Sequence, residues 1–133
     1  MKLLRLRGRK ICEQLLRKGN VWKGRQMTIR FLVSAPRHPS VDPTKPGIYI
    51  GTVASAKLDK SAVKRNRMRR RCREAFRVTL KEVEKPLVAQ LLILPRSSSL
   101  TCAFPEIQSD VRAFLSVLDT WRNRVHGNSS NSR

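Results

Sequence analysis

An almost uninterrupted apolar run, LVAQLLIL at residues 87–94, lies between Pro86 and Pro95. A run of this length between two prolines favours a strand over a helix. Because its apolar residues do not alternate with polar ones, both faces of the strand are expected to be buried. The sheet that contains it must therefore be covered by helices, which is typical of a small α+β domain.

Two further strands and three helices are predicted from hydrophobic spacing. In residues 25–34 apolar Met27, Ile29 and Phe31 alternate with more polar neighbours, and a second strand is predicted at 48–56. The stretch between them is rich in proline and is expected to be a loop, so these two strands are predicted to form a hairpin.

The predicted helices complete one domain over residues 1–126, which a chain of 133 residues with 40% hydrophobic residues can support around one core. The element order is then helix, strand, strand, helix, strand, helix. The polar tail at 127–133 is expected to be disordered. The three helices are predicted at residues 8–18, 61–85 and 105–124.

The middle helix, with Ser61 as its N-cap, has one apolar face. At about 100° per residue a continuous seam runs along it. Pro86 ends the helix, because the residue before a proline is disfavoured in helical conformation. The seam consists of Met68, Cys72, Ala75, Phe76, Thr79, Leu80 and Val83.

The remaining faces of this helix carry a large excess of cations. Several of them crowd the helix start, where the macrodipole is already positive, and others repel one another at i, i+3 and i, i+4. Such concentrated violations of local rules are expected at functional sites. A phosphate backbone would relieve the repulsion, because helix N-terminal N–H groups and arginines both bind anions. Glu74 is the single acid in this stretch. The cations are Lys64, Arg65, Arg67, Arg69, Arg70, Arg71, Arg73 and Arg77.

The whole chain has a net charge of +20, from 29 Lys and Arg against nine Asp and Glu, which favours nucleic acid over a membrane surface as partner. No segment approaches the roughly 18 apolar residues of a transmembrane helix, and the first ten residues lack the apolar run of a signal peptide. We therefore expect a cytoplasmic protein with no membrane partner. Cys12, Cys72 and Cys102 form no CxxC pair and are expected to be buried thiols.

The nine carboxylates show no spacing typical of acid–base or two-metal catalysis. We therefore expect no catalytic and no metal-ligating residue in the protein. Glu106 and Asp110 share a face of the last predicted helix, and both are expected to be solvated.

The stretch from residue 54 to 77, ASAKLDKSAVKRNRMRRRCREAFR, resembles the signature of the bacterial ribonuclease P protein family. That signature has a Lys-containing strand end, then Ala-Val, then Arg-Asn-Arg and a basic helix ending in Arg-Glu-Ala-Phe. The resemblance extends from about residue 5 to residue 120 and includes RLRGRKICEQLLRKG and GRQM. The matching signature residues are Lys57, Ala62, Val63, Arg65, Asn66, Arg67, Arg70, Arg73, Glu74, Ala75 and Phe76.

The resemblance implies an RNA-binding subunit that joins a large catalytic RNA and assists cleavage of 5′ leaders from precursor tRNA. It implies that Mg²⁺ acts in the holoenzyme and is bound mainly by RNA, with no obligate protein partner. It also implies a left-handed strand-helix-strand crossover, against the usual rule. Taken with the charge pattern, the expected RNA-binding set is Lys57, Lys60, Lys64, Arg65, Asn66, Arg67, Arg69, Arg70 and Arg73.

The resemblance further implies a groove between the first helix and the sheet that receives the single-stranded leader. The family commonly has aromatic residues where Cys12 and Leu16 stand, and often one at Arg30. Aromatic faces stack unpaired bases, worth roughly 1 to 3 kcal/mol per base. Leader contacts here are expected to use charge and apolar packing instead. The leader set is Cys12, Leu16, Thr28 and Arg30, and plain packing of the helix is an equal alternative for the first two.

Three other functions share parts of this pattern. A ribosomal or other structural RNA-binding protein would share the charge without needing the ordered basic signature. A DNA-binding regulator would want a helix-turn-helix, which a long helix flanked by strands fits badly, so no DNA partner is expected. A self-sufficient nuclease would need the clustered carboxylates that are missing.

Overall fold

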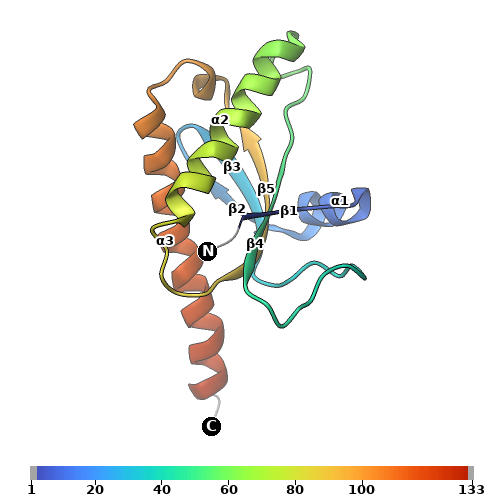
Figure 1. Ribbon diagram of the computed structural model, residues 1–133, viewed down its shortest axis with the longest axis vertical. Helices are drawn as coiled ribbons and strands as arrows, with labels where there is room; N and C mark the ends of the chain where they lie inside the picture. The colour runs from blue at the N-terminus through green and yellow to red at the C-terminus, as the bar shows by residue number, and fades with distance from the viewer. Residues whose placement is uncertain (1–2, 132–133) are drawn as a thin grey trace.

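The computed structural model of the chain describes the backbone of residues 3–131 and the side chains of residues 3–122 (Figure 1). Within these residues a five-stranded sheet packs with three helices, which confirms the predicted α+β class. None of the described helices is both long and apolar enough to cross a bilayer. The elements are β1 (Leu3–Arg5), α1 (Arg9–Lys18), β2 (Asn20–Lys23), β3 (Met27–Leu32), β4 (Gly47–Thr52), α2 (Ala62–Leu80), β5 (Val88–Pro95), the short 3-10 helix η1 (Ser97–Leu100) and α3 (Phe104–Asn131).

β5 lies at the centre of the sheet, whose strand order is β1-β4-β5-β3-β2. It pairs in parallel with β4 and antiparallel with β3. Residues 89–93 are all buried. The prediction of a central strand buried on both faces is therefore confirmed.

The prediction that the strands at residues 25–34 and 48–56 form a hairpin is wrong. β3 and β4 are not neighbours, because β5 lies between them and hydrogen-bonds to both. β3 forms its hairpin with β2 instead, through a turn in which the Gly24 N–H donates to the Met27 carbonyl at 2.8 Å. The proline-rich loop therefore carries the chain across β5 to a strand on its other side.

Two short edge strands, β1 and β2, are absent from the predicted element order. β1 has three residues and pairs in parallel with β4, from Leu3 opposite Ile48 to Arg5 opposite Ile50. β2 begins at Asn20, two residues after the predicted end of the first helix at residue 18. Strands of three and four residues are too short to display an alternating pattern, so tertiary pairing alone defines them.

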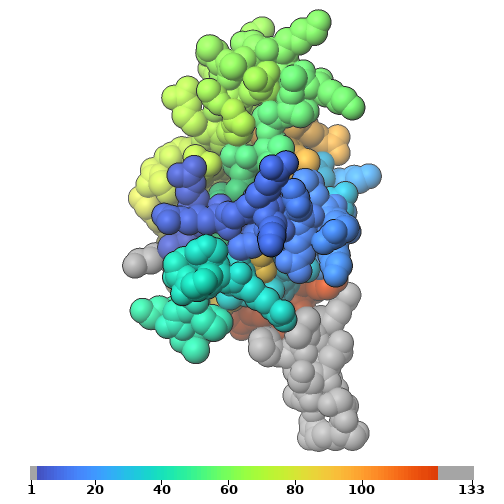
Figure 2. All heavy atoms as spheres, turned by 90° about the vertical axis from the view of Figure 1, so that its right-hand side faces the viewer, coloured from blue at the N-terminus to red at the C-terminus, as the bar shows by residue number. Residues whose placement is uncertain are grey.

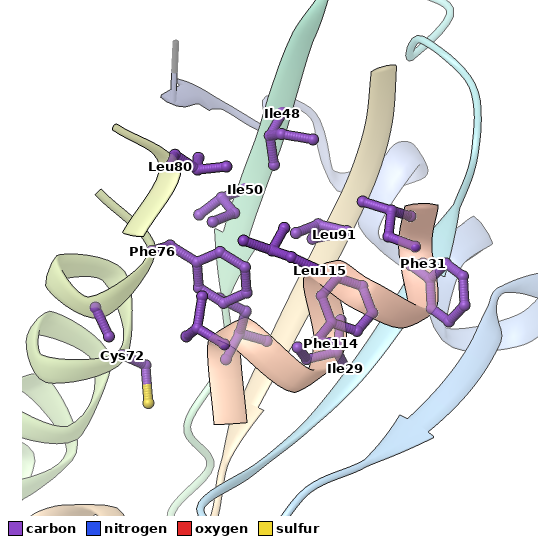
Figure 3. Packing of buried hydrophobic residues seen from close by; sticks show 14 of the residues in the cluster. Ile29, Phe31, Ile48, Ile50, Cys72, Phe76, Leu80, Leu91, Phe114 and Leu115 are labelled. Atoms are coloured by element: carbon purple, nitrogen blue, oxygen red, sulfur yellow. The ribbon is translucent and has the colours of Figure 1, made fainter. Parts of the chain in front are cut away.

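The helices cover opposite faces of the sheet: α2 and α3 lie on one side and α1 on the other (Figure 1). Figure 3 shows the larger core, where Phe76 of α2 and Phe31 of β3 both pack edge-on against Phe114 of α3. On the other face Leu15 of α1 packs with Leu92 of β5. Two buried faces on β5 explain why its sequence does not alternate.

The ends of three elements differ from the predictions. α2 ends at Leu80, because residues 81–83 turn through hydrogen bonds between residues three apart, such as Val83 N–H to the Leu80 carbonyl at 3.2 Å. The strand predicted to residue 56 ends at Thr52, and Lys57 lies in a turn. α3 continues to Asn131, past its predicted end, and the region predicted to be disordered lies beyond the described side chains.

β4, α2 and β5 form a parallel strand-helix-strand unit. The resemblance implies a strand-helix-strand crossover of this kind. That the crossover is left-handed stays a prediction.

Candidate nucleic-acid interface

The first turn of α2 is built by two polar residues that precede it. Ser61 is the N-cap, as predicted, and its hydroxyl accepts the Lys64 N–H at 3.3 Å. The Asp59 carboxylate accepts the Ser61 N–H at 2.8 Å. No acidic residue lies within the first turn, so the positive end of the helix dipole is not offset there.

The apolar seam holds α2 against the sheet and α3. Six of the seven predicted seam residues are buried, and Val83 is partly buried in the turn after the helix. Burial of this face turns the remaining side chains outward along the helix. The buried six are Met68, Cys72, Ala75, Phe76, Thr79 and Leu80.

Five of the predicted RNA-binding cations are exposed, and their charged groups have no partner among the described residues. None of these ammonium or guanidinium groups makes a hydrogen bond or salt bridge to the described chain, so their charges are free to meet an external anion. They lie in the first half of α2 and in the segment before it, and the start of the helix projects beyond the end of the sheet (Figure 1). They are Lys57, Lys60, Lys64, Arg67 and Arg70.

The other four predicted residues are held by neighbours. Arg65 is half-buried and donates from Nη1 to the carbonyls of Asp59 and Lys60, at 2.8 and 3.1 Å. Asn66 accepts a hydrogen bond from Arg69. Arg73 reaches across to β4 and donates to the Thr52 hydroxyl at 3.3 Å. These contacts orient the guanidinium groups before any ligand binds.

Two arginines of the cationic run, neither of them in the predicted RNA-binding set, serve the protein itself. Arg71 donates to the carbonyls of Ser99 and Cys102 and so anchors the η1 loop to α2. Arg77 pairs with Glu74, and the hydrogen bonds between them lower the pKa of the Glu74 carboxyl and raise that of Arg77. Glu74, the single acid of the run, thus compensates a charge near the C-terminal end of the run. The cations near the helix start remain uncompensated.

The outer face of α2 borders two shallow hollows. One of about 410 Å³ is lined by Asn66, Arg69, Arg70 and Arg73. The other, of about 460 Å³, adds the apolar side chains of Leu3 and Phe104 to five arginines and Glu74 of α2. Guanidinium groups grouped in this way suit bidentate contacts with phosphate. Leu3 and Phe104 are site residues that the sequence does not indicate, because only the folded chain brings β1 and α3 beside α2.

The predicted leader set lies on the α1 side of the sheet. In β3, Thr28 stands opposite Leu94 and Arg30 opposite Leu92, on the face that α1 partly covers. Leu16 of α1 is 42% exposed. Cys12 packs against the Leu15–Leu92 cluster, which favours the packing role that was one of its two alternatives.

All three cysteines are free thiols. Burial raises the pKa of each, and that of Cys72 to about 12. Cys72 is fully buried in the α2 seam, whereas Cys12 and Cys102 are only partly buried. The expectation of three buried thiols is therefore correct for Cys72 alone.

The prediction that Glu106 and Asp110 of α3 are both solvated is wrong for Asp110. Asp110 is only 8% exposed, and its carboxylate accepts the N–H groups of Arg25 and Gln26 at 3.3 and 2.7 Å. Glu106 is exposed and accepts the Ala103 N–H at 3.2 Å. These two carboxylates fix a turn and a helix start, and within residues 3–122 no three His, Cys, Asp or Glu side chains gather where a metal ion could bind.

Comparisons with known proteins agree on one family. The family model described as Ribonuclease P matches residues 1–119. The ribonuclease P protein component of Synechococcus sp. (strain JA-2-3B'a(2-13)) is 32% identical over 115 residues, which are 86% of this chain and 81% of the relative.

Solved structures share the fold. The Staphylococcus aureus RNase P protein matches with a TM-score of 0.63 at 21% identity, covering 87% of this chain and 95% of that one. The Thermotoga maritima RNase P protein matches with a TM-score of 0.62 at 19% identity, covering 86% and 94%.

Proposed function

Because the chain belongs to the ribonuclease P protein family, we propose that it is the protein subunit of a ribonuclease P ribonucleoprotein. It binds the catalytic RNA through the outer face of α2 and assists endonucleolytic removal of the 5′ leader from precursor tRNA. The leader passes over the α1 side of the sheet, near Leu16, Thr28 and Arg30.

The observation that carries this proposal is the set of exposed cations around the start of α2 that have no partner in the described protein. Their mutual repulsion is relieved when RNA phosphates approach, and each phosphate contact releases a counterion. The three held residues Arg65, Arg69 and Arg73 present their guanidinium groups in fixed positions, so less conformational entropy is lost on binding.

The chemistry of cleavage belongs to the RNA subunit in this proposal. Mg²⁺ held by RNA would activate water and stabilise the leaving group. The carboxylates of the protein are dispersed or engaged in turns, so the protein residues bind and position RNA without taking part in the reaction.

Reconstitution tests the proposal. The purified protein is mixed with precursor tRNA and Mg²⁺, with and without the catalytic RNA of the same organism, and release of the leader is followed on a gel. The protein alone is expected not to cleave. At physiological salt, the catalytic RNA is expected to cleave faster with the protein than without it. Cleavage by the protein alone would show a nuclease. RNA binding without any stimulation of cleavage would favour a structural RNA-binding protein.

A further inference from the structure

A further cationic hollow, of about 450 Å³, lies on the α1 side of the sheet, the face opposite α2. It forms where β1 and the start of α1 meet the proline-rich loop after β3, segments that adjoin in Figure 2. Its volume falls within the range of about 300 to 1,000 Å³ typical of small-ligand sites. No residue of α2 lines this hollow, and neither does any residue of the leader set.

The charge of this hollow is positive. Arg5, Arg7 and Lys45 line it, and all three are exposed. None of their charged side-chain groups forms a hydrogen bond or salt bridge with a residue of the described chain. One carboxylate, Asp42, also lines it. That carboxylate accepts the N–H and hydroxyl of Thr44 at 2.9 and 2.6 Å, which occupies one of its oxygens within the loop.

A buried tyrosine supplies the second observation. Tyr49 of β4 lines the hollow and is only 7% exposed, because its ring packs with Leu6, Leu15 and Leu92. Its hydroxyl has no hydrogen-bond partner among the described residues. The hydroxyl is not one of the buried unpaired polar atoms of the described residues, so it reaches solvent and can bond a ligand that enters the hollow.

The loop contributes an oriented histidine. The Ser40 N–H donates to Nδ1 of His38 at 3.1 Å, so in the neutral ring Nε2 carries the proton and is a donor. The other walls of the hollow are apolar. They come from Leu4, Ile11, Pro36, Val41 and Pro46.

From this arrangement we propose that the hollow binds one unpaired nucleotide of RNA. The phosphate contacts Arg5, Arg7 and Lys45, and the base or ribose enters between the apolar walls and accepts a hydrogen bond from the Tyr49 hydroxyl. The inference rests on the proposed function, since it requires an RNA partner. An unpaired nucleotide fits better than a duplex, because bases held in a helix cannot enter a recess of this size.

A smaller hollow of about 220 Å³ shares lining residues both with this site and with the hollows on the α2 face. It is lined by both Arg5 and Arg73, together with Leu3, Leu4 and Ile50. β1 is an edge strand and pairs only with β4, so its outer backbone groups are also open to a ligand. One RNA strand can therefore contact α2, cross the edge of the sheet and place a nucleotide beside Tyr49.

Two variants test the site: Tyr49→Phe removes only the hydroxyl, and Arg7→Ala removes one lining charge. Binding of each variant is measured first to the catalytic RNA alone, and then, in the assembled holoenzyme, to precursor tRNA and to leaderless tRNA. Tyr49→Phe is expected to weaken binding about two- to tenfold in one of these arms. Arg7→Ala is expected to reduce the slope of log K against log salt by about 0.7 in the same arm.

The arm that responds identifies the source of the nucleotide. Loss of affinity for the catalytic RNA assigns it to that RNA, and loss seen only with precursor, not with leaderless tRNA, assigns it to the leader. Arg9→Ala is the matched control, because Arg9 lies in the same segment but pairs with Glu13 at 3.2 Å and does not line the hollow. Its binding should stay within twofold of wild type.

The proposal is overturned if the double variant Arg7→Ala with Tyr49→Phe melts like wild type and binds like Arg9→Ala in every arm. Failure of the proposed function looks different, because then the unaltered protein does not stimulate cleavage by the catalytic RNA at all. A crosslink from 4-thiouridine-substituted RNA to the peptide of residues 36–49 would support the site independently of affinity.

Discussion

Arg65 donates a hydrogen bond from Nη1 to the carbonyl oxygen of Asp59 at 2.8 Å, so the first arginine of the Arg-Asn-Arg motif is held by the turn that leads into α2. The same nitrogen bonds the Lys60 carbonyl at 3.1 Å. Arg67, two residues later, is exposed and has no partner among the described residues. The two arginines of the motif therefore differ: Arg65 also shapes the helix entry, whereas the Arg67 guanidinium is held by no described residue and is wholly available to RNA.

Replacement of Arg65 by alanine should lower the free energy of unfolding by about 1 to 2 kcal/mol, because two hydrogen bonds from its guanidinium group to backbone carbonyls are lost. Urea unfolding of the free protein measures this. The neighbouring Lys64→Ala variant is the charge-matched control. It should unfold at the same urea concentration or slightly higher, because it removes a cation from the positive end of a helix. Equal unfolding midpoints for Arg65→Ala and wild type would contradict the structural role.

Alanine at both Arg67 and Arg70 should weaken binding to the catalytic RNA and flatten its salt dependence. Each lost phosphate contact reduces the slope of log K against log salt by about 0.7 to 0.9. Filter binding at several salt concentrations gives this slope, and the unfolding midpoint should not change.

The control for that experiment is Arg112→Ala, which removes one positive charge from α3, where Arg112 pairs with Glu82 at 3.2 Å. Its slope should match wild type. An unchanged slope in the double variant would refute the assignment of the α2 face to RNA.

Asp110→Ala should destabilise the protein by about 1.5 to 3 kcal/mol, because the Gln26 N–H loses its charged acceptor in a buried setting. Asp110→Asn keeps one acceptor oxygen and should lose less. Asp119 lies on the same helix, but its carboxylate has no hydrogen bond or ion pair to the described residues. Its alanine variant is the control and should stay within about 0.5 kcal/mol of wild type. Urea unfolding at pH 7 compares the three, and equal losses at both positions would argue against the turn-fixing role.

Alkaline pH should destabilise the protein partly through Cys72, whose pKa is raised to about 12 by burial. Above the ordinary thiol pKa the unfolded chain has released this proton while the folded chain keeps it. The free energy of unfolding therefore falls as pH rises from about 9 towards 12, by up to roughly 1.4 kcal/mol per pH unit.

Comparison of wild type with Cys72→Ala isolates this effect. The stability advantage of wild type should be largest near pH 8 and should shrink by pH 10.5, as measured by urea unfolding at each pH. Parallel pH profiles for the two proteins would mean that the Cys72 thiol titrates normally.

Periodicity predicts the helices and the central strand well because it reflects burial directly. The seam from Met68 to Leu80 repeats at helical spacing, and all six of its predicted positions in α2 are buried. Alternation in β3 likewise identifies Ile29 and Phe31 as core residues. Such patterns show which face is buried, but they do not show which strands are neighbours, so the hairpin prediction failed.

Some features of the candidate site can likewise be predicted from the sequence, and others cannot. The excess of cations on α2 is visible in the sequence, and so is the start of the helix at Ser61. The partners of Arg65 and Arg71 are not visible, because both donate to backbone carbonyls whose positions depend on the path of the 59–60 and 99–102 segments. Asp110 is similar, since its acceptor role depends on a hairpin turn 84 residues away in sequence.

The central position of β5 affects the order in which the protein can fold. Without residues 88–95, the remaining strands form two separate ladders, β1 with β4 and β2 with β3, and nothing hydrogen-bonds one ladder to the other. A growing chain on the ribosome therefore cannot close its sheet until β5 has emerged. Until then the basic helix has no completed sheet to pack on, and the open strand edges make nascent chains prone to aggregation.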